Sequence, residues 1–340
     1  MAAASLKAPK SLSGPLRSAA PSVGLALGGG GARGLAHIVM LEAFDELGLR
    51  PKIIAGTSIG AIFGAAYASG MTAREIRVHT EELLTARFEL VRDLFRARVR
   101  KLPKFSDMFS ARAALLAPDA VLDFLLPERV ARDFAHLEIP LKLVASDFYG
   151  LEPVVFTEGP LRRAIAASMA LPVIFEPVVV DGRALIDGGL TNPLPFDLLM
   201  GEADITVAID VSGAPVPTPG RNHPTATEAL FASSFIFERT IVREKLKSQQ
   251  PDIYIDAGTS HFQILDILKV KEILAAAEPA KQKLKAQLAR IMGAETLPEI
   301  APPETMIALA GFATGSELEP DGKPRRRLLK ALKPKPRRKR

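Results

Sequence analysis

The 340-residue chain contains no cysteine, which excludes disulfide bonds, thiolate metal sites and a cysteine nucleophile. Its five histidines are His37, His79, His136, His223 and His261, and their spacing matches no histidine metal motif. The sequence has no run of about 18 uninterrupted apolar residues, so it predicts no transmembrane helix. We therefore expect no metal ion and no membrane-spanning segment. No cofactor is expected either.

The positive charge of the chain is concentrated in one segment. The formal net charge is +6, yet residues 323–340 hold eleven lysines and arginines and no acidic residue, so the rest of the chain is mildly acidic. A basic segment that also contains prolines is typically disordered. The functional alternatives for this segment are binding to an anionic membrane surface and binding to nucleic acid.

Composition and periodicity divide the chain into four parts. Residues 1–22 are rich in small residues, proline and serine without the apolar run of a secretory signal, and we expect a disordered leader. Residues 23–211 alternate strand and helix patterns and form the expected main domain. Within it, residues 88–134 lack a regular pattern and are interpreted as a cap of short helices and loops. Residues 212–296 are expected to form a helical extension packed on the core, and residues 297–340 a proline-containing linker and the basic tail.

Two glycine-rich turns each follow a short apolar strand and open a helix. The sequence G-G-G-G-A-R-G occupies Gly28–Gly34, and G-T-S-I-G occupies Gly56–Gly60. A strand–helix–strand unit is almost always right-handed with parallel strands, whose carboxyl ends lie at the same edge of the sheet. We therefore expect the two turns to lie side by side.

The second turn places Ser58 at a sharp corner between a strand and a helix. Gly56 and Gly60 lack side chains that would collide there, so the hydroxyl group is exposed at the start of the helix. A serine nucleophile requires such a fixed geometry and a base. An ordinary strand-to-helix turn has the same residues, and the pentapeptide alone leaves both interpretations open.

The first turn can direct successive backbone N–H groups into one concavity, which suits an oxyanion or a phosphate equally well. Because Gly29–Gly34 also fits G-x-G-x-x-G, a dinucleotide site is the rival interpretation. Such a site expects an acidic residue at the end of the second strand, where this chain has Gly-Thr-Ser. Arg33 is expected either to steady the loop or to hold a phosphate of the substrate.

The base for Ser58 is expected to be an aspartate, because none of the histidines lies in a triad context. Asp187 lies in A-L-I-D-G-G-L-T-N-P, where a strand ends at the rim of the sheet and two glycines follow. An Asp-Gly turn is also a frequent structural feature. Asp147 and Asp210 follow strands too and compete for the role, but they lack the double glycine.

Four motifs, taken in order, resemble those of the patatin-like phospholipase family, and the resemblance covers about residues 23–211. The motifs are G-G-G-A-R-G at Gly29–Gly34, G-T-S-I-G at Gly56–Gly60, A-A-S-M-A-L-P at Ala166–Pro172 and D-G-G at Asp187–Gly189, followed by N-P-L-P at Asn192–Pro195.

The resemblance implies an α/β fold of three layers, α/β/α, with a mainly parallel central sheet and a C-terminal helical extension. It also implies a Ser–Asp dyad in which Ser58 is the nucleophile and Asp187 the proton acceptor. The oxyanion hole would be formed by Gly29, Gly30 and Gly31. Residues implied to support these motifs are Arg33, Gly34, Gly56, Gly60, Gly188 and Gly189.

The function implied by the resemblance is hydrolysis of carboxylic ester bonds in phospholipids or lysophospholipids through an acyl-Ser58 intermediate. A general esterase or acyltransferase is the alternative within this class, and a non-catalytic lipid- or nucleotide-binding module the alternative outside it. The expected partners are a lipid or fatty-acyl ester substrate and, through the basic tail, an anionic membrane; nucleic acid is not expected. The expected location is the cytoplasm, with peripheral membrane contact.

Overall fold

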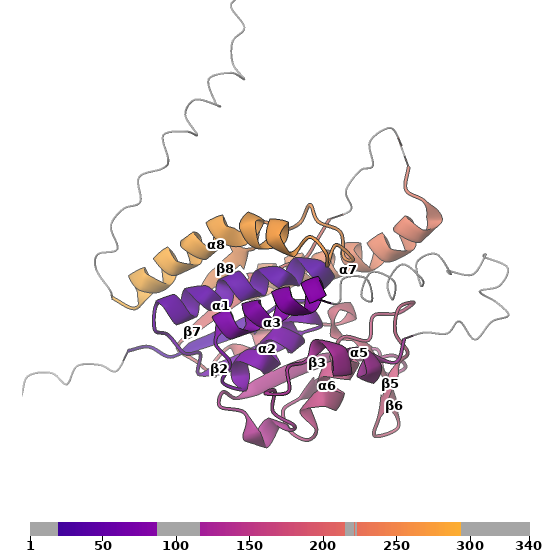
Figure 1. The fold of residues 1–340 in the computed structure, drawn as a ribbon, viewed down its shortest axis with the longest axis horizontal. Coiled ribbons are helices and arrows are strands. Elements are labelled where there is room, and N and C mark those ends of the chain that lie inside the picture. Colours follow the sequence, from indigo (N-terminus) through magenta and orange to yellow (C-terminus); the bar gives the residue numbers. More distant parts are fainter. Residues whose placement is uncertain (1–19, 87–115, 215–220, 222, 294–340) are drawn as a thin grey trace, which may run out of the picture. The chain divides into compact units, whose positions relative to one another are not determined.

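The computed structural model describes residues 20–86, 116–214, 221 and 223–293 (Figure 1). All of them belong to one compact unit, Met1–Glu295. Nearly all of the expected leader, residues 88–115 of the expected cap, and the linker with the basic tail lie outside the described residues.

An eight-stranded sheet forms the centre of this unit (Figure 1). The strand order is β5-β6-β3-β2-β1-β7-β8, and β4 pairs separately with β3. Five strands are parallel to one another, whereas β4, β5 and β6 run antiparallel to their neighbours. The strands are β1 (Val23–Leu27), β2 (Ile53–Thr57), β3 (Leu141–Asp147), β4 (Pro153–Phe156), β5 (Val178–Val180), β6 (Arg183–Asp187), β7 (Ile205–Asp210) and β8 (Ile253–Asp256).

Helices cover both faces of the sheet, which confirms the expected three-layer fold with a mainly parallel sheet. The α-helices are α1 (Ala36–Glu46), α2 (Ile59–Ala68), α3 (Ala73–Ala86), α5 (Pro118–Leu125), α6 (Leu161–Ser168), α7 (Ala226–Ser248) and α8 (Val270–Ile291). The 3-10 helices are η1 (Gly31–Leu35), η2 (Phe134–His136), η3 (Gly188–Leu190) and η4 (Phe196–Leu199). One hydrophobic cluster joins the sheet to α1, α2, α6 and α8, and a smaller one joins it to η4 and α7.

Strand β1 shows how the sequence builds these layers. Leu25 and Leu27 belong to the larger cluster, whereas Ala26 faces the smaller one, where Phe196 of η4 packs. Successive side chains of a strand point to opposite faces, so a strand covered on both faces is apolar throughout. All five residues of β1 are buried accordingly.

The segment after residue 211 adds to the same sheet. Strand β8 pairs in parallel with β7, and α8 lies beside α1 (Figure 1). The ammonium group of Lys281 on α8 lies 3.2 Å from Glu42 and 2.5 Å from Glu46, both on α1. Buried charge thus supplements apolar packing where this segment joins the core.

Strand β3 brings the ends of two other strands together. Thr57 at the end of β2 pairs with Val144, and Asp187 at the end of β6 pairs with the next residue, Ala145. Strand β4 pairs with both Val144 and Ala145. Since a strand residue has one neighbour on each side, β2 and β6 must lie along the same side of β3. They run toward each other and end at one junction, whereas the sequence suggested only that Asp187 reaches the rim.

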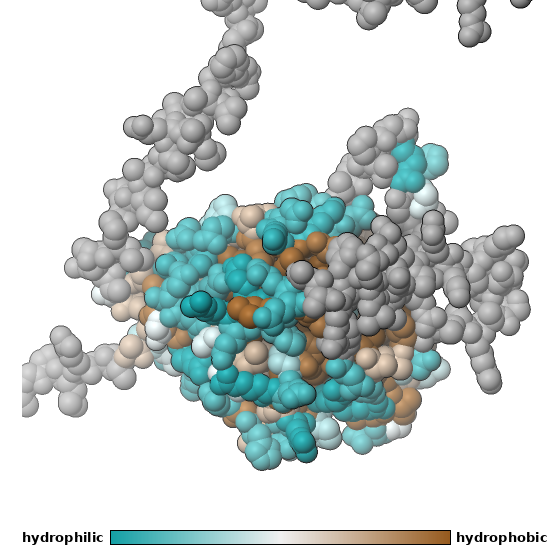
Figure 2. Space-filling view, in the orientation of Figure 1, coloured by the Kyte–Doolittle hydropathy of each residue, from teal (hydrophilic) through white to brown (hydrophobic). Residues whose placement is uncertain are grey.

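The surface in Figure 2 is mostly hydrophilic over α1, α3 and α8, with hydrophobic side chains reaching it in smaller areas. In the β3–β4 turn, Tyr149 and Leu151 are 81% and 84% exposed. Within the described ranges, no helix combines the length and apolarity that crossing a bilayer requires.

Candidate active site

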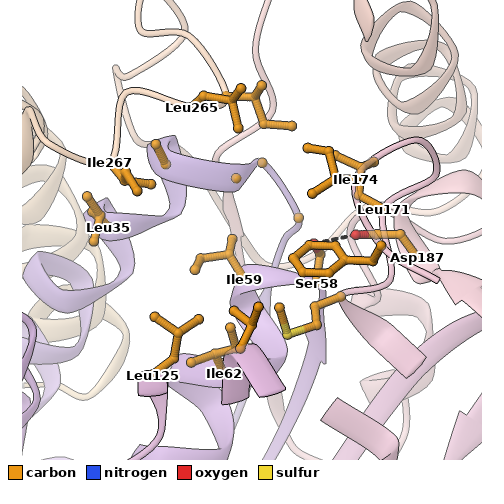
Figure 3. A pocket seen from close by; sticks show the side chains of 18 of the residues that line it. Leu35, Ser58, Ile59, Ile62, Leu125, Leu171, Ile174, Asp187, Leu265 and Ile267 are labelled. Carbon is orange, nitrogen blue, oxygen red and sulfur yellow. Dashed lines mark hydrogen bonds between the residues drawn. The ribbon is translucent and has the colours of Figure 1, made fainter. Parts of the chain in front are cut away.

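Ser58 and Asp187 meet at the junction between β2 and β6. The Ser58 hydroxyl donates a hydrogen bond to Asp187 Oδ2, with an Oγ–Oδ2 distance of 2.6 Å (Figure 3). Asp187 Oδ1 accepts a hydrogen bond from the Gly189 N–H at 2.8 Å. Both oxygens are therefore engaged, which fixes the orientation of the buried carboxyl group.

The backbone of Ser58 is strained, with φ 55° and ψ −120°. Residues other than glycine rarely adopt such angles, so the surrounding structure must hold them. The Ser58 N–H donates to Ser168 Oγ at 2.9 Å, and the neighbouring Thr57 hydroxyl donates to Asn192 O at 2.8 Å. Ser168 lies in the A-A-S-M-A-L-P motif, which by itself suggests no role for this residue. The structure shows that it anchors the corner that turns the Ser58 hydroxyl toward Asp187.

The first glycine turn faces Ser58. The Gly29 N–H donates to Pro193 O at 2.9 Å, so it is not free to bind an oxyanion, contrary to the expectation for Gly29. Among the described residues, no carbonyl accepts the N–H of Gly30 or Gly31, and both line the same pocket as Ser58. Gly31 has φ +59°, and a Cβ atom there would lie 2.2 Å from Ile264 Cγ1, so only glycine fits. The available donors are therefore Gly30 and Gly31.

Two basic side chains support this loop from outside the pocket. The Arg33 guanidinium donates from Nε to Phe262 O at 2.9 Å and lies 4.7 Å from the centre of the Phe235 ring. Arg33 is buried and does not line the pocket, which favours loop support over phosphate binding. His37 Nε2 lies 2.8 Å from Gly28 O, and burial lowers the pKa of His37 to about 4. Because a carbonyl only accepts, this nitrogen carries the proton of a neutral ring.

The Asn192-Pro193 motif ties the two turns together. Asn192 O accepts from the second turn and Pro193 O from the first. The Asn192 side chain donates to Asp197, and Lys245 of α7 binds Asp197 at 2.6 Å. Helix α7 is thereby attached to the loop that holds both turns.

The competing aspartates have structural partners of their own. Asp147 Oδ1 accepts the N–H groups of Tyr149 and Gly150, which close the β3–β4 turn. Asp210 accepts the Tyr254 hydroxyl at 2.6 Å and the Ser212 N–H at 2.7 Å. In the described part of the chain, Ser58 donates its hydroxyl to Asp187 and not to either of these two, so the geometry favours Asp187 as its partner.

An apolar pocket opens beside the Ser58–Asp187 pair (Figure 3). It contains about 860 Å³ of empty space, part of it open to solvent. Of the described residues that line it, only Ser58, Asp187 and Glu238 have polar side chains, and none is basic. Its apolar lining residues include Leu35, Ile59, Ile62, Leu125, Leu171, Ile174, Leu265 and Ile267. Such a pocket suits a hydrocarbon chain and offers no cation to a phosphate.

Two buried carboxyl groups at this pocket have raised pKa values. Burial raises the pKa of Asp187 to about 6, while the hydrogen bonds from Ser58 and Gly189 oppose the shift. Burial, and then the charge of Asp187, raise the pKa of Glu238 to about 8, while Arg33 opposes it. Sequence reasoning missed Glu238, because it lies on α7 without a motif and only the fold brings it to the pocket.

No group of acidic or histidine side chains in the described part of the chain is arranged to hold a metal ion. The described site offers a hydroxyl group, carboxyl groups and backbone N–H donors.

The chain is similar in sequence to proteins of several organisms. An uncharacterized NTE family protein of Mycobacterium bovis is 39% identical over 199 residues, covering 58% of this chain and 51% of that protein. Patatin-like phospholipase domain-containing protein 7 of Rattus norvegicus is 34% identical over 197 residues, covering 56% of this chain and 14% of that protein. The chain thus spans about half the length of the mycobacterial relative.

Among solved structures, VipD from Legionella pneumophila overlaps with a TM-score of 0.41 at 16% identity, covering 78% of this chain and 67% of VipD. The family model described as patatin-like phospholipase matches residues 25–200, more than half of the chain. The chain therefore belongs to the patatin-like phospholipase family.

Proposed function

We propose that this protein is a lipid acyl hydrolase that cleaves carboxylic ester bonds through an acyl-Ser58 intermediate. The observation that carries the proposal is the 2.6 Å hydrogen bond between Ser58 Oγ and Asp187 Oδ2 at the wall of an apolar pocket. Membership of the patatin-like phospholipase family supports the same class of reaction.

In the first half of the proposed reaction, Asp187 accepts the Ser58 proton while Ser58 Oγ attacks the ester carbonyl carbon. The carbonyl oxygen becomes an oxyanion, and the N–H groups of Gly30 and Gly31 stabilise it. The bond to the alcohol oxygen then breaks, and this oxygen takes the proton from Asp187. The alcohol leaves and the acyl group stays on Ser58.

In the second half, Asp187 accepts a proton from a water molecule that attacks the acyl carbon. The same N–H groups stabilise the second oxyanion. Its collapse releases the fatty acid, and Ser58 Oγ recovers the proton from Asp187. One residue serves as base and acid in turn, and a carboxyl pKa near neutrality suits both roles.

The substrates we propose are phospholipids or lysophospholipids, bound by an acyl chain. The apolar lining of the pocket supports entry of the chain. Because no described basic side chain lines the pocket, we propose that a phosphate-bearing head group stays outside it.

A fluorophosphonate with an alkyl chain tests the proposal, because it phosphonylates an activated serine. We expect the wild-type protein to become labelled on the peptide that contains Ser58, and the Ser58→Ala variant to stay unlabelled. Ser233→Ala on α7 is the matched control, since its hydroxyl bonds to Ala229 O within the helix. Folded wild-type protein that never labels would contradict the proposal.

For the basic tail, residues 323–340, we propose peripheral contact with anionic membranes. Sedimentation with vesicles that contain phosphatidylserine, compared with phosphatidylcholine alone, tests this. We expect removal of residues 323–340 to abolish the preference for the anionic vesicles, and 0.5 M salt to weaken it in the full chain. Equal binding by both proteins would refute this role.

A further inference from the structure

Glu238 is a buried acid that the two-residue mechanism above does not use. It is 5% exposed and lines the same pocket as Ser58 and Asp187. It lies on α7, outside residues 25–200 that match the family model. Lys245, which follows Glu238 by seven residues on the same helix, anchors the helix to Asp197.

Gly189 locates the Glu238 carboxyl relative to the pair. A Cβ atom built on Gly189 would lie 3.0 Å from Glu238 Oε1 and 3.1 Å from Asp187 Oδ1. Both carboxyl groups therefore border the space that a side chain at Gly189 would occupy. The Glu238 carboxyl thus lies close to the Asp187 carboxyl, in the wall of the pocket that would hold the ester.

The partners of the two acids differ. Asp187 accepts hydrogen bonds on both oxygens, whereas no donor in the described part of the chain hydrogen-bonds to Glu238. A buried carboxyl without a partner is unfavourable, most of all when it is ionised. Its surroundings favour the protonated form, which has an O–H group to donate.

The polar atoms of an ester indicate which acceptor the Glu238 carboxyl would bind. In the proposed reaction, the carbonyl oxygen faces the N–H groups of Gly30 and Gly31, and the carbonyl carbon faces Ser58. The alcohol-side oxygen is the remaining polar atom, and negative charge develops on it as its bond to carbon breaks. It is an acceptor that a neutral carboxylic acid can serve.

We propose that Glu238 is a catalytic residue whose uncharged carboxyl donates a hydrogen bond to the alcohol-side oxygen of the bound ester and so assists its departure. The inference rests on the acyl hydrolysis proposed above. Glu238 keeps its own proton throughout, because the departing oxygen takes the proton that Asp187 accepted from Ser58. The balance of atoms and charges in the reaction is unchanged.

The charged groups around Glu238 determine how this donor responds to pH. Asp187 of β6 and Asp210 at the end of β7 disfavour its ionised form, whereas Arg33 of η1 favours that form. Ionisation of Glu238 would remove the donor and add a negative charge beside a developing oxyanion. We therefore expect kcat/KM to fall as pH rises above about 8.

Two variants and two substrates test this role. Glu238→Gln keeps a hydrogen-bond donor without a titratable charge, whereas Glu238→Leu removes the donor. A p-nitrophenyl ester has a good leaving group that needs little assistance, whereas an alkyl ester of the same acid has a poor one. Glu244→Gln and Glu244→Leu are the controls, since Glu244 lies on the same helix with its side chain 53% exposed.

We expect Glu238→Leu to lower kcat/KM about tenfold for the alkyl ester, the value of one hydrogen bond, and far less for the p-nitrophenyl ester. Glu238→Gln should stay within about threefold of wild type at pH 7 and lose the decline above pH 8. Equal losses on both substrates, or an unchanged decline in Glu238→Gln, would overturn the inference. Absence of any Ser58-dependent turnover in the wild type would instead refute the hydrolase itself.

Discussion

The end of β6 and the middle of α7 each bring a buried carboxyl group to the same pocket, and the two groups differ in their hydrogen-bond partners. Asp187 has a hydrogen bond on each oxygen, from Ser58 and from Gly189. Glu238 accepts none from the described residues. Burial raises the pKa of both, but hydrogen bonds to the charged form hold Asp187 at about 6, while Glu238 reaches about 8. The charges of Asp187 and Asp210 raise the pKa of Glu238 further, so hydrogen bonds and neighbouring charges together separate a base from a donor here.

The strongest test of this comparison is Asp187→Asn. Asparagine keeps the shape of the side chain but cannot accept the Ser58 proton, so we expect kcat/KM to fall about 10³- to 10⁴-fold. Ester hydrolysis and thermal unfolding measured together separate lost chemistry from lost folding. Asp181→Asn in the exposed β5–β6 turn is the control and should keep full activity. A loss below tenfold in Asp187→Asn would remove Asp187 from the role of base.

The acid side of the pH profile tests the same residue without a mutation. Asp187 must be ionised to accept a proton, so we expect kcat/KM to decline as pH falls through about 6 and to lose tenfold per unit well below it. Glu238→Gln should keep this decline, because the variant leaves Asp187 in place. A flat profile between pH 5 and 7 would contradict the assignment.

Gly189→Ala acts on both carboxyl groups at once. Its methyl group would lie 3.0 Å from Glu238 Oε1 and 3.1 Å from Asp187 Oδ1, so at least one must move. We expect about a tenfold loss of kcat, since small displacements of a catalytic group are costly. Combining it with Glu238→Ala, which frees space, should cost less than the product of the single effects. Strictly multiplicative effects would show that the two sites do not interact.

The smallest effect expected is on stability. The folded-state pKa of Glu238 lies above its usual value of 4.5, so the contribution of this group to stability is fully present below that value and is lost as pH rises through about 8. Glutamine does not ionise, so Glu238→Gln should be more stable than wild type at pH 9 by roughly 1 to 3 kcal/mol and about equal at pH 5. Thermal unfolding of both proteins at the two pH values measures this. An equal difference in stability between variant and wild type at both pH values would contradict a raised pKa of Glu238.

Local sequence patterns predicted much of the fold and the pair of residues at its centre. The short apolar strand expected before the first glycine turn is β1, Val23–Leu27, because an apolar run that ends at Gly28 permits few alternatives. Ser58 and Asp187 were found because each lies in a glycine turn whose sequence reflects its backbone. The structure brings these two residues together, and their roles as nucleophile and base remain predictions for the experiments above.

Other features depended on contacts between distant segments. The pairing of β6 alongside β2 on one side of β3 follows from register, which a strand of five residues does not encode. The Gly29 N–H was expected in the oxyanion hole, but Pro193, far along the chain, accepts it. Glu238 has no local signal at all. Such residues acquire their surroundings only from the folded chain.

The most direct test of the central claim is to trap the acyl group on Ser58. Wild-type protein would be mixed with a p-nitrophenyl ester, quenched in acid within milliseconds and digested for mass spectrometry. The account predicts a burst of p-nitrophenol close to one equivalent of protein, with the acyl mass on the peptide that contains Ser58. Turnover with no acyl group on that peptide, or with the acyl group on another residue, would contradict it.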